Sequence, residues 1–380
     1  MTMVHQRPSM LQGLAALRAW EGPRLLKQLL PLSVLLMALS ATAGTPARAQ
    51  GIIPNETIAS TVPPNGDLNP YGVAFVPIDF EGGGPLHFGD ILVSNFNDKA
   101  NQQGTGTTVV RINPEGRLSV FFQGPKGLGL TTALGILKAG FVLVGNLPTK
   151  NGTAATIKAP GSLLILDRGG HLIANLVDAT FLDGPWDLTV NDQGAQAQVF
   201  VSNVLNGTVT RLNLQVTGPR KISVESATLI GMGYRHRTDP AALVVGPTGL
   251  AYDAAKDLLY VASTDDNEIF VIPNAGSATS AVFKGNLVYR DERHLRGPVG
   301  LALAPNGDLL TTNGDAINPN PLQQSEVVEF TTTGQFVAQF SADPSVGGGA
   351  FGIAFNSSSG KTLLALVDDV VNTLDVFTLP

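Results

Sequence analysis

The sequence predicts an all-β protein, a six-bladed β-propeller built from four-stranded antiparallel blades. Three observations carry this prediction: a short motif recurs along the chain, two further apolar runs follow each copy, and the last repeat lacks its fourth strand. Each repeat covers roughly 45–55 residues, which suits a propeller blade with its loops. The six copies are Gly-Val-Ala-Phe (72–75), Ala-Leu-Gly-Ile (133–136), Asp-Leu-Thr-Val (187–190), Gly-Leu-Ala-Tyr (249–252), Gly-Leu-Ala-Leu (300–303) and Gly-Ile-Ala-Phe (352–355).

Each motif copy is expected to form the first strand of a blade. In the first repeat, the runs 91–95, 109–112 and 118–122 supply the second, third and fourth strands. Five repeats contain such a fourth strand, whereas the sixth ends at Pro380 without one. The predicted blades span 69–123, 130–178, 184–232, 246–290, 297–341 and 349–379.

The N-terminal segment 57–62 has the composition of a strand and belongs to no repeat. A ring of blades that stays open would expose two sheet edges, and exposed edges are templates for aggregation. We therefore expect residues 57–62 to complete the last blade and close the ring.

Residues 1–49 have the pattern of a signal peptide. Arg24 and Lys27 precede the apolar stretch 29–39, and Ala47-Arg48-Ala49 forms a small-residue cleavage site. We predict export to the periplasm or the extracellular space and a single propeller domain over 50–380. An uncleaved membrane anchor is the alternative, although the apolar stretch is short for a transmembrane helix.

The composition narrows the classes of partner. The whole chain has a formal net charge of −6, and removing residues 1–49 takes away five basic residues and one acidic residue. An acidic chain is poorly suited to nucleic acid, because that binding rests on neutralising phosphates. No membrane association is expected after signal cleavage. The chain contains no cysteine, so no disulfide supports the fold.

The predicted loops divide the two faces of the propeller. The long connections 95–107, 146–161 and 313–325 share one side, named here the long-loop face. The short turns 113–116, 167–170 and 305–308 share the other side, the hairpin face, which looks purely structural. Because long loops on a rigid scaffold usually carry function, we expect a protein, glycan or small-molecule ligand on the long-loop face.

Second strands end in Asn or Asp in most blades, which permits two interpretations. The residues are Asn95, Asn146, Asn203, Asn313 and Asp368. As a ring of oxygen ligands they would suit a hard cation such as Ca²⁺. As local caps they would bind backbone amides of the turn that each begins. Recurrence in nearly every blade favours capping.

Two charged connections on the long-loop face are candidates for ligand binding. One contains Arg235 and His236, and the other contains Arg290 and His294. The histidines could serve as general bases and the arginines as anion clamps. Solvated loops whose charges pair locally are the alternative, and it is favoured because exposed ion pairs are common and weak.

The chain lacks the usual catalytic signatures: it has no G-x-S-x-G elbow, no H-E-x-x-H motif and no Walker loop. Its repeat resembles those of the NHL-repeat and SMP-30/gluconolactonase-like six-bladed propellers. The resemblance rests on Pro-x-Gly-Leu/Val-Ala followed by a strand ending in Asn or Asp, as in Gly-Pro-Thr-Gly-Leu-Ala (246–251) and Gly-Pro-Val-Gly-Leu-Ala (297–302).

The resemblance implies a calcium site whose ligands open the first strands in Pro-Asn-Gly and Pro-Asp-Gly motifs. The matching positions here hold no carboxylate or carboxamide: they are Tyr71, Thr132, Trp186, Thr248, Val299 and Phe351. Asp187 lies one position later and, by strand alternation, is expected to point away from the channel. Tyr71, Trp186 and Phe351 would suit an apolar or aromatic ligand, or would plug the pore.

The sequence therefore favours an exported binding or scaffolding module without a catalytic constellation and without a cofactor. The alternative is a calcium-assisted hydrolase or lyase of the SMP-30/gluconolactonase type with a non-standard ligand set. A lyase like the streptogramin-inactivating propellers is a weaker third hypothesis, because those propellers have seven blades and six are predicted here.

Overall fold

The computed structural model describes residues 56–314, 317, 326–342, 348–358 and 360–379. The described residues all belong to one compact unit, 51–380, and the predicted signal peptide lies outside the described residues. Within the described ranges, the structure contains no helix with the length and apolar character needed to cross a membrane.

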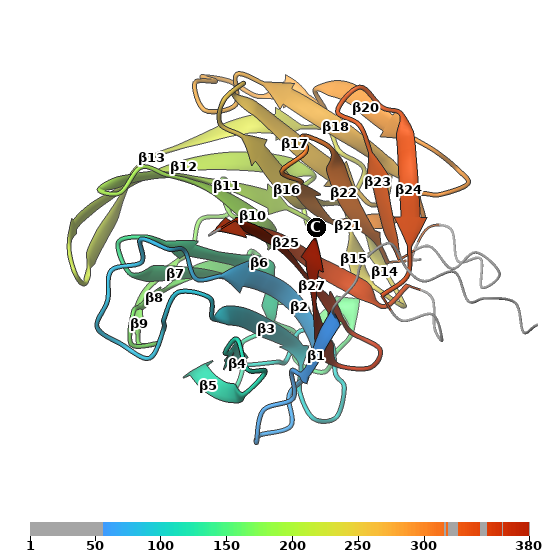
Figure 1. Ribbon diagram of the computed structural model, residues 1–380. Helices are drawn as coiled ribbons and strands as arrows, with labels where there is room; N and C mark the ends of the chain where they lie inside the picture. The colour runs from blue at the N-terminus through green and yellow to red at the C-terminus, as the bar shows by residue number, and fades with distance from the viewer. Residues whose placement is uncertain (1–55, 315–316, 318–325, 343–347, 359, 380) are drawn as a thin grey trace, which may run out of the picture. The chain divides into compact units, whose positions relative to one another are not determined.

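Six small antiparallel sheets form the blades of a propeller (Figure 1), as predicted. The blade strands are, in chain order, β2 (Leu68–Phe75), β3 (Ile91–Asn97), β4 (Thr108–Ile112) and β5 (Leu118–Gln123); β6 (Leu130–Leu137), β7 (Phe141–Asn146), β8 (Ser162–Asp167) and β9 (Leu172–Leu176); β10 (Pro185–Asp192), β11 (Gln196–Asn203), β12 (Thr208–Gly218) and β13 (Lys221–Met232); β16 (Pro247–Asp253), β17 (Leu258–Ser263), β18 (Glu268–Pro273) and β20 (Asn286–Arg290); β21 (Pro298–Leu303), β22 (Leu309–Asn313), β23 (Val327–Phe330) and β24 (Phe336–Phe340); and β25 (Ala350–Ser358), β26 (Lys361–Asp368) and β27 (Thr373–Leu379).

The N-terminal strand closes the ring. β1 (Glu56–Ser60) pairs antiparallel with β27, with Ile58 opposite Asp375 and Ala59 opposite Leu374. The backbone N–H of Thr61 then donates to the carbonyl oxygen of Asn372 at 3.0 Å. The last blade therefore takes its fourth strand from the start of the domain, which confirms the closure predicted from the sequence.

Three smaller elements lie outside the regular four-stranded blades. β19 (Val282–Phe283) adds a parallel strand to the outer edge of blade 3 beside β13. A short hairpin, β14 (Arg237–Asp239) and β15 (Leu243–Val245), precedes blade 4. A 3₁₀ turn, η1 (Ala154–Thr156), lies in the connection between β7 and β8.

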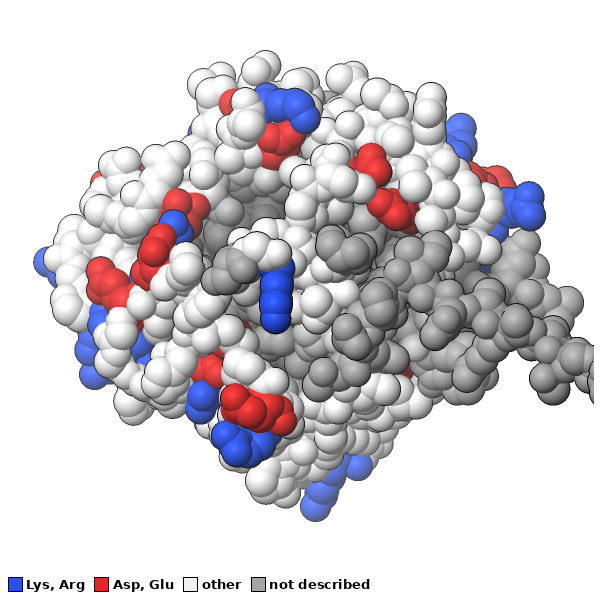
Figure 2. All heavy atoms as spheres, in the orientation of Figure 1, with Lys and Arg blue, Asp and Glu red and all other residues white. Residues whose placement is uncertain are grey.

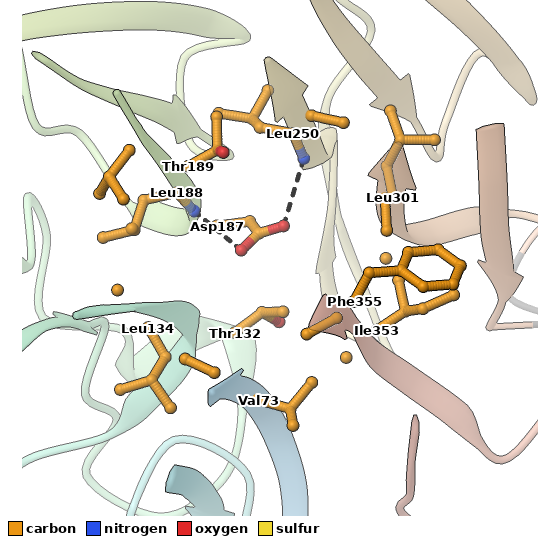
Figure 3. A pocket seen from close by; sticks show the side chains of 18 of the residues that line it. Val73, Thr132, Leu134, Asp187, Leu188, Thr189, Leu250, Leu301, Ile353 and Phe355 are labelled. Carbon is orange, nitrogen blue, oxygen red and sulfur yellow. Dashed lines mark hydrogen bonds between the residues drawn. The ribbon is translucent and has the colours of Figure 1, made fainter. Parts of the chain in front are cut away.

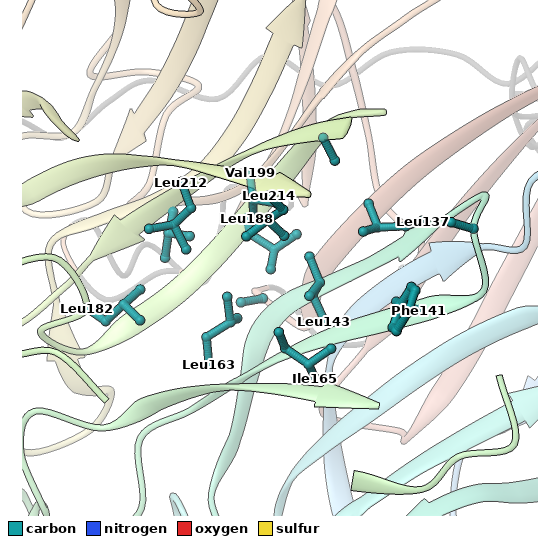
Figure 4. Close-up of a cluster of buried hydrophobic side chains, with 14 residues drawn as sticks. Leu137, Phe141, Leu143, Leu163, Ile165, Leu182, Leu188, Val199, Leu212 and Leu214 are labelled. Atoms are coloured by element: carbon teal, nitrogen blue, oxygen red, sulfur yellow. The ribbon is translucent and has the colours of Figure 1, made fainter. Parts of the chain in front are cut away.

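Each seam between neighbouring blades has its own apolar core. Blades 2 and 3 are joined by leucines and other apolar residues of both sheets, including Leu143, Leu163, Leu188 and Leu212 (Figure 4). Corresponding clusters fill the other five seams. The cluster that joins blades 6 and 1 contains Ala59 of β1, so closure of the last blade also completes the sixth core. Burial of apolar surface in these seams is the main stabilising contribution expected for such a ring.

Antiparallel strand order fixes what each face carries. The first strands begin at the long-loop face and end at the hairpin face. The connection 76–90, between β2 and β3, therefore lies on the hairpin face, and it is long. There Arg168 of blade 2 binds Glu81 at 2.9 Å and the carbonyl oxygen of Gly82 at 2.6 Å. The sequence interpretation of this face as short turns alone missed that connection.

Charged side chains are scattered in small groups of mixed sign among the described residues in view in Figure 2. Typical groups are the ion pairs of Arg237 with Asp265 at 2.8 Å and of Lys284 with Asp266 at 2.7 Å.

Candidate functional site in the central channel

The innermost strand of every blade lies at a sheet edge. β2, β6, β10, β16, β21 and β25 each stand at one end of the strand order. An edge strand keeps one row of backbone N–H and C=O groups outside the ladder. In a closed ring these six rows face the central channel, so its wall is partly made of backbone polar groups.

Aromatic side chains close the channel where the first strands begin. Tyr71 of β2 stacks on Phe351 of β25 with ring centroids 4.0 Å apart, and on Phe96 of β3 at 4.5 Å. The Trp186 ring of β10 lies 6.0 Å from Tyr71 and 5.4 Å from Phe96. Blades 1 and 3 are not neighbours in the ring, so these contacts cross the channel. We name Tyr71, Phe96, Trp186 and Phe351 the aromatic plug.

The aromatic plug is well packed. Tyr71 is 4% exposed and Trp186 is 3% exposed. Leu147, Val204 and Val244 complete the same apolar cluster. Burial raises the pKa of the Tyr71 phenol well above its ordinary value, because a phenolate would lose its hydration there. The structure thus brings the three predicted aromatic residues into one cluster, in which Tyr71 contacts the other two, and the geometry favours plugging the pore over contacting a ligand.

A cavity of about 340 Å³ occupies the remainder of the channel (Figure 3). Its wall comes from the six first strands, from the level of Thr132 and Asp187 to the level of Phe75 and Phe355. Tyr71, Trp186 and Thr248, near the strand beginnings, are buried, whereas Phe75, Val190 and Phe355 at the strand ends are only half-buried. The cavity therefore opens on the hairpin face, opposite the aromatic plug. We refer to it as the channel cavity.

Asp187 lies at the closed end of the channel cavity, with its carboxyl between Leu188 and Leu250 (Figure 3). Its Oδ1 accepts the backbone N–H of Leu188 at 2.8 Å, and its Oδ2 accepts that of Leu250, in the next blade, at 3.3 Å. Burial raises the pKa of this carboxyl to about 8 and outweighs the two hydrogen bonds, which lower the pKa. A carboxyl with this pKa is largely neutral at pH 7.

The orientation predicted for Asp187 was wrong, and a bulge explains why. In the ladder between β10 and β11, Pro185 pairs with Asn203 and Asp187 pairs with Ser202, so Trp186 has no partner. One unpaired residue breaks the alternation of side chains along a strand. Trp186 consequently joins the aromatic plug while Asp187 faces the channel cavity. All six first strands have a register irregularity near their start.

Asp187 also departs from the repeat. The equivalent positions of the other blades hold Gly72, Ala133, Gly249, Gly300 and Gly352. A Cβ on Gly352 would lie 2.2 Å from the carbonyl oxygen of Tyr71, and one on Gly300 would lie 2.3 Å from that of Phe351. Neighbouring backbones are thus too close for side chains at those two positions. Blade 3 alone has an ionisable side chain at this position of the repeat.

The Asn residues at the ends of second strands bind backbone groups. Each is hydrogen-bonded to the segment leading into the first strand of its own blade: Asn95 Nδ2 to Thr61 O (3.1 Å), Asn146 Oδ1 to Gly129 N (2.8 Å), Asn203 Nδ2 to Phe181 O (3.1 Å) and Asn313 Oδ1 to Arg296 N (2.9 Å). Asp368 differs, since its Oδ1 accepts the N–H groups of Val370 and Val371 in the turn that follows. The capping hypothesis predicted that every one of these residues would accept N–H groups of the turn that follows it, as Asp368 does. The Asn residues are instead hydrogen-bonded to the segment that precedes the first strand of the blade.

These residues do not fit a resident calcium ion. Among the described residues, no group of three or more His, Cys, Asp or Glu is arranged to hold a metal ion. The first-strand positions that the resemblance assigns to ligands contribute aromatic rings, hydroxyl groups and a valine. Asp187 supplies one carboxyl, whereas Ca²⁺ takes six to eight oxygen ligands.

The charged connections make their described contacts locally. Arg235 and His236 are exposed. The backbone N–H of Arg235 donates to Asp266 at 3.1 Å, its guanidinium lies 4.0 Å from the same carboxyl, and His236 Nδ1 lies 3.1 Å from the carbonyl oxygen of Tyr234. A weak ion pair of this kind is the pattern expected of solvated loops.

The second connection is similar. Arg290 pairs with Glu268, and His294 Nδ1 is hydrogen-bonded to Asp291. The His294 ring stacks on Phe336 with centroids 4.0 Å apart. These two pairs involve only residues of blades 4 and 5 and their connection, away from the channel cavity.

The long loops of blades 1 and 2 are hydrogen-bonded to each other. The Thr149 N–H donates to the carbonyl oxygen of Gly104 at 2.7 Å, and its hydroxyl donates to that of Gln103 at 2.6 Å. The Gln103 side chain in turn donates to the carbonyl oxygen of Ala241 at 2.6 Å. Most of the third predicted loop, 313–325, lies outside the described residues.

Sequence reasoning missed two functional features. Phe96 stands between Asn95 and Asn97 at the end of β3, and an aromatic residue between two polar ones was the available signal for the plug. The second is the open end of the channel cavity, because its wall consists of the recurrent first-strand motif, which predicts the blades but carries no sign of a cavity.

Similar solved structures are propellers. A gluconolactonase from Xanthomonas campestris matches with a TM-score of 0.54 at 13% identity, over 87% of this chain and 91% of that chain. The calcium-binding protein regucalcin from Agrobacterium tumefaciens has a TM-score of 0.49 at 14% identity, over 85% and 95%. A streptogramin B lyase has a TM-score of 0.39 at 14% identity, over 87% and 99%.

At such low identity the gluconolactonase match defines the class of fold and nothing finer. The chain is a six-bladed propeller similar to the SMP-30/gluconolactonase type, and the resemblance predicted from the sequence is confirmed for the fold. No family model matches the chain. No curated protein matches it either.

Proposed function

We propose that this protein is an exported binding module and that its ligand site is the channel cavity, reached from the hairpin face. The observation that carries the proposal is the asymmetry of the channel. The aromatic plug closes one end, whereas the other end opens into a cavity of about 340 Å³. Concave, largely preformed cavities of this size are the usual sites for small ligands.

The chemistry of the cavity supports binding more than catalysis. Acid–base and nucleophilic mechanisms generally need a second group that activates or orients the first. The lining contains one carboxyl, that of Asp187, and the hydroxyl groups of Thr132, Thr189 and Tyr252, of which that of Tyr252 donates to Asp257 at 2.9 Å. Asp187 itself is held by two backbone N–H groups. A single carboxyl among apolar, hydroxyl and backbone groups is suited to recognising a ligand.

Blocking the cavity tests the proposal. A library of small fragments would be screened against the full chain by ligand-observed NMR, and the binders titrated against Thr189→Trp, in which a large ring fills the cavity. Ser119→Trp, on the exposed face of β5, is the matched control. We expect Thr189→Trp to lose binding and Ser119→Trp to retain it. Equal binding to both variants, or no binder to the wild type, contradicts the proposal.

A calcium-assisted hydrolase or lyase is the second candidate. The presence of a carboxyl in the channel of a gluconolactonase-like fold is the observation that favours it. A ligand at 100 times its Kd stabilises the folded state by about 2.7 kcal/mol, so a resident ion would produce a clear rise in Tm. We expect calcium and a chelator to leave Tm unchanged and metal analysis of the purified protein to find no stoichiometric calcium. Stoichiometric calcium with a chelator-sensitive Tm would favour the enzyme.

Export and a partner on the long-loop face rest on the sequence. N-terminal sequencing of protein recovered from the periplasm or medium should begin at Gln50. Retention of residues 1–49 in a membrane fraction would favour the anchor. Binding of a protein or glycan by the long-loop face stays a prediction.

A further inference from the structure

The charged side chains that line the channel cavity are of one sign only. Among the described residues that line the cavity, Asp187 is the one acidic residue, and none is Lys, Arg or His. Most of the remaining residues are aliphatic or aromatic, and Phe75, Tyr252 and Phe355 stand at the open end. A buried charge is costly unless it is paired, so an anionic ligand would find no cationic side chain in the lining, whereas a cation would find the Asp187 carboxyl.

We propose that the channel cavity binds a small organic cation, whose ammonium group contacts the Asp187 carboxyl and whose apolar body extends towards Phe75 and Phe355. This inference rests on the proposed function and names its class of ligand. The cavity volume of about 340 Å³ limits the ligand to a small molecule.

The carboxyl has unused capacity for hydrogen bonds. An ionised carboxylate offers about four acceptor positions, and the N–H groups of Leu188 and Leu250 occupy two. Asp187 also keeps some exposed surface although it lies deep in the channel. An ammonium group, with three donors, can use the remaining positions, and hydrogen bonds between charged partners are stronger than neutral ones.

Binding is coupled to proton release. Without a ligand the carboxyl is largely protonated at neutral pH, since burial raises its pKa to about 8. The protonated Asp187 and an ammonium ion give the carboxylate–ammonium pair and one proton released to water. Tyr252 is the other titratable group of the lining, and its pKa is raised to about 12, so it stays neutral across this range. Within the part of the chain that the structure describes, β2, β6, β11, β16, β21 and β25 contribute no further titratable side chain to the lining.

The pH dependence follows from this coupling. Well below pH 8 the ionised fraction of Asp187 rises nearly tenfold for each pH unit, and it rises less steeply as the pH approaches 8. The affinity for a cation should rise with it. The affinity should level off above about pH 8 and fall only when the amine itself loses its proton. A neutral ligand of the same shape should show no such rise.

The experiment compares three probes that share a ring and differ in charge: cyclohexylmethylamine, cyclohexylmethanol and cyclohexanecarboxylate. Each is titrated by calorimetry into the full chain, into Asp187→Asn and into Glu225→Gln. Glu225 is exposed on β13, so its variant is a control that removes one negative charge away from the channel. We expect the amine to bind wild type and Glu225→Gln at least about tenfold more tightly than the alcohol, and Asp187→Asn to lose that preference.

Three outcomes overturn the inference. In the first, the alcohol or the carboxylate binds the wild type as tightly as the amine. The cavity would then bind ligands but would not recognise a cation. The second is an amine affinity that is flat between about pH 6 and about pH 8 in the wild type, a result that does not depend on how Asp187→Asn folds. The third is the absence of binding by all three probes, in which case the fragment screen with Thr189→Trp decides the fate of the proposed function separately.

Discussion

The two ends of the channel differ although the same six strands form both. At the long-loop face three of the strands carry large rings near their beginning, and Tyr71 contacts both Trp186 and Phe351. At the hairpin face the same three strands reach Phe75, Val190 and Phe355, which remain half-buried around an open cavity. Loop length is therefore a poor guide to which end of a propeller channel is accessible, because a few side chains decide which end is closed.

The largest expected effect comes from opening the aromatic plug. Trp186→Ala removes a buried ring that contacts Tyr71 and Phe96, and such truncations cost about 3–5 kcal/mol. Phe355→Ala, at the open end, removes a half-buried ring and should cost less than half as much. Urea unfolding of the two variants measures the contrast. Equal losses would mean that the two ends are packed alike.

A smaller effect is expected where second strands fasten the start of each blade. Asn146→Ala removes the acceptor for the Gly129 N–H and the donor to Ser162, both buried, and should cost about 1–3 kcal/mol. Gln123→Ala, on an exposed position of β5, should stay within about 0.5 kcal/mol of wild type. Chemical denaturation compares the two. A loss for Asn146→Ala no larger than that for Gln123→Ala would remove the structural role assigned to the Asn.

The pH dependence of stability distinguishes Asp187 from an exposed carboxyl. Its folded-state pKa of about 8 lies above the unfolded value of about 3.9, so the folded state binds more protons between them. Stability contributed by this group is complete below about pH 4 and is lost as the pH rises to about 8, by at most about 1.4 kcal/mol per pH unit. Subtracting the unfolding profile of Asp187→Asn isolates this contribution. A difference that grows with pH would show that the pKa of Asp187 is lowered.

The sequence predicted the ring because the repeat, the turns and the missing strand all depend on local patterns. It also identified three of the four rings of the aromatic plug, because they occupy one position of the repeat. It failed at Asp187, since the bulge at Trp186 shifts the alternation by one residue and strand patterns carry no sign of a bulge. It also misjudged the hairpin face, where the connection 76–90 follows β2.

Thiol accessibility tests the asymmetry of the channel most directly, because the chain contains no cysteine and each introduced thiol is the only one. Thr189→Cys places a thiol in the wall of the channel cavity, and Thr248→Cys places one at a buried first-strand position at the opposite end, 3% exposed. A coloured disulfide reagent should label Thr189→Cys in the folded protein and label Thr248→Cys only after unfolding. Rapid labelling of Thr248→Cys with protection of Thr189→Cys would contradict the account.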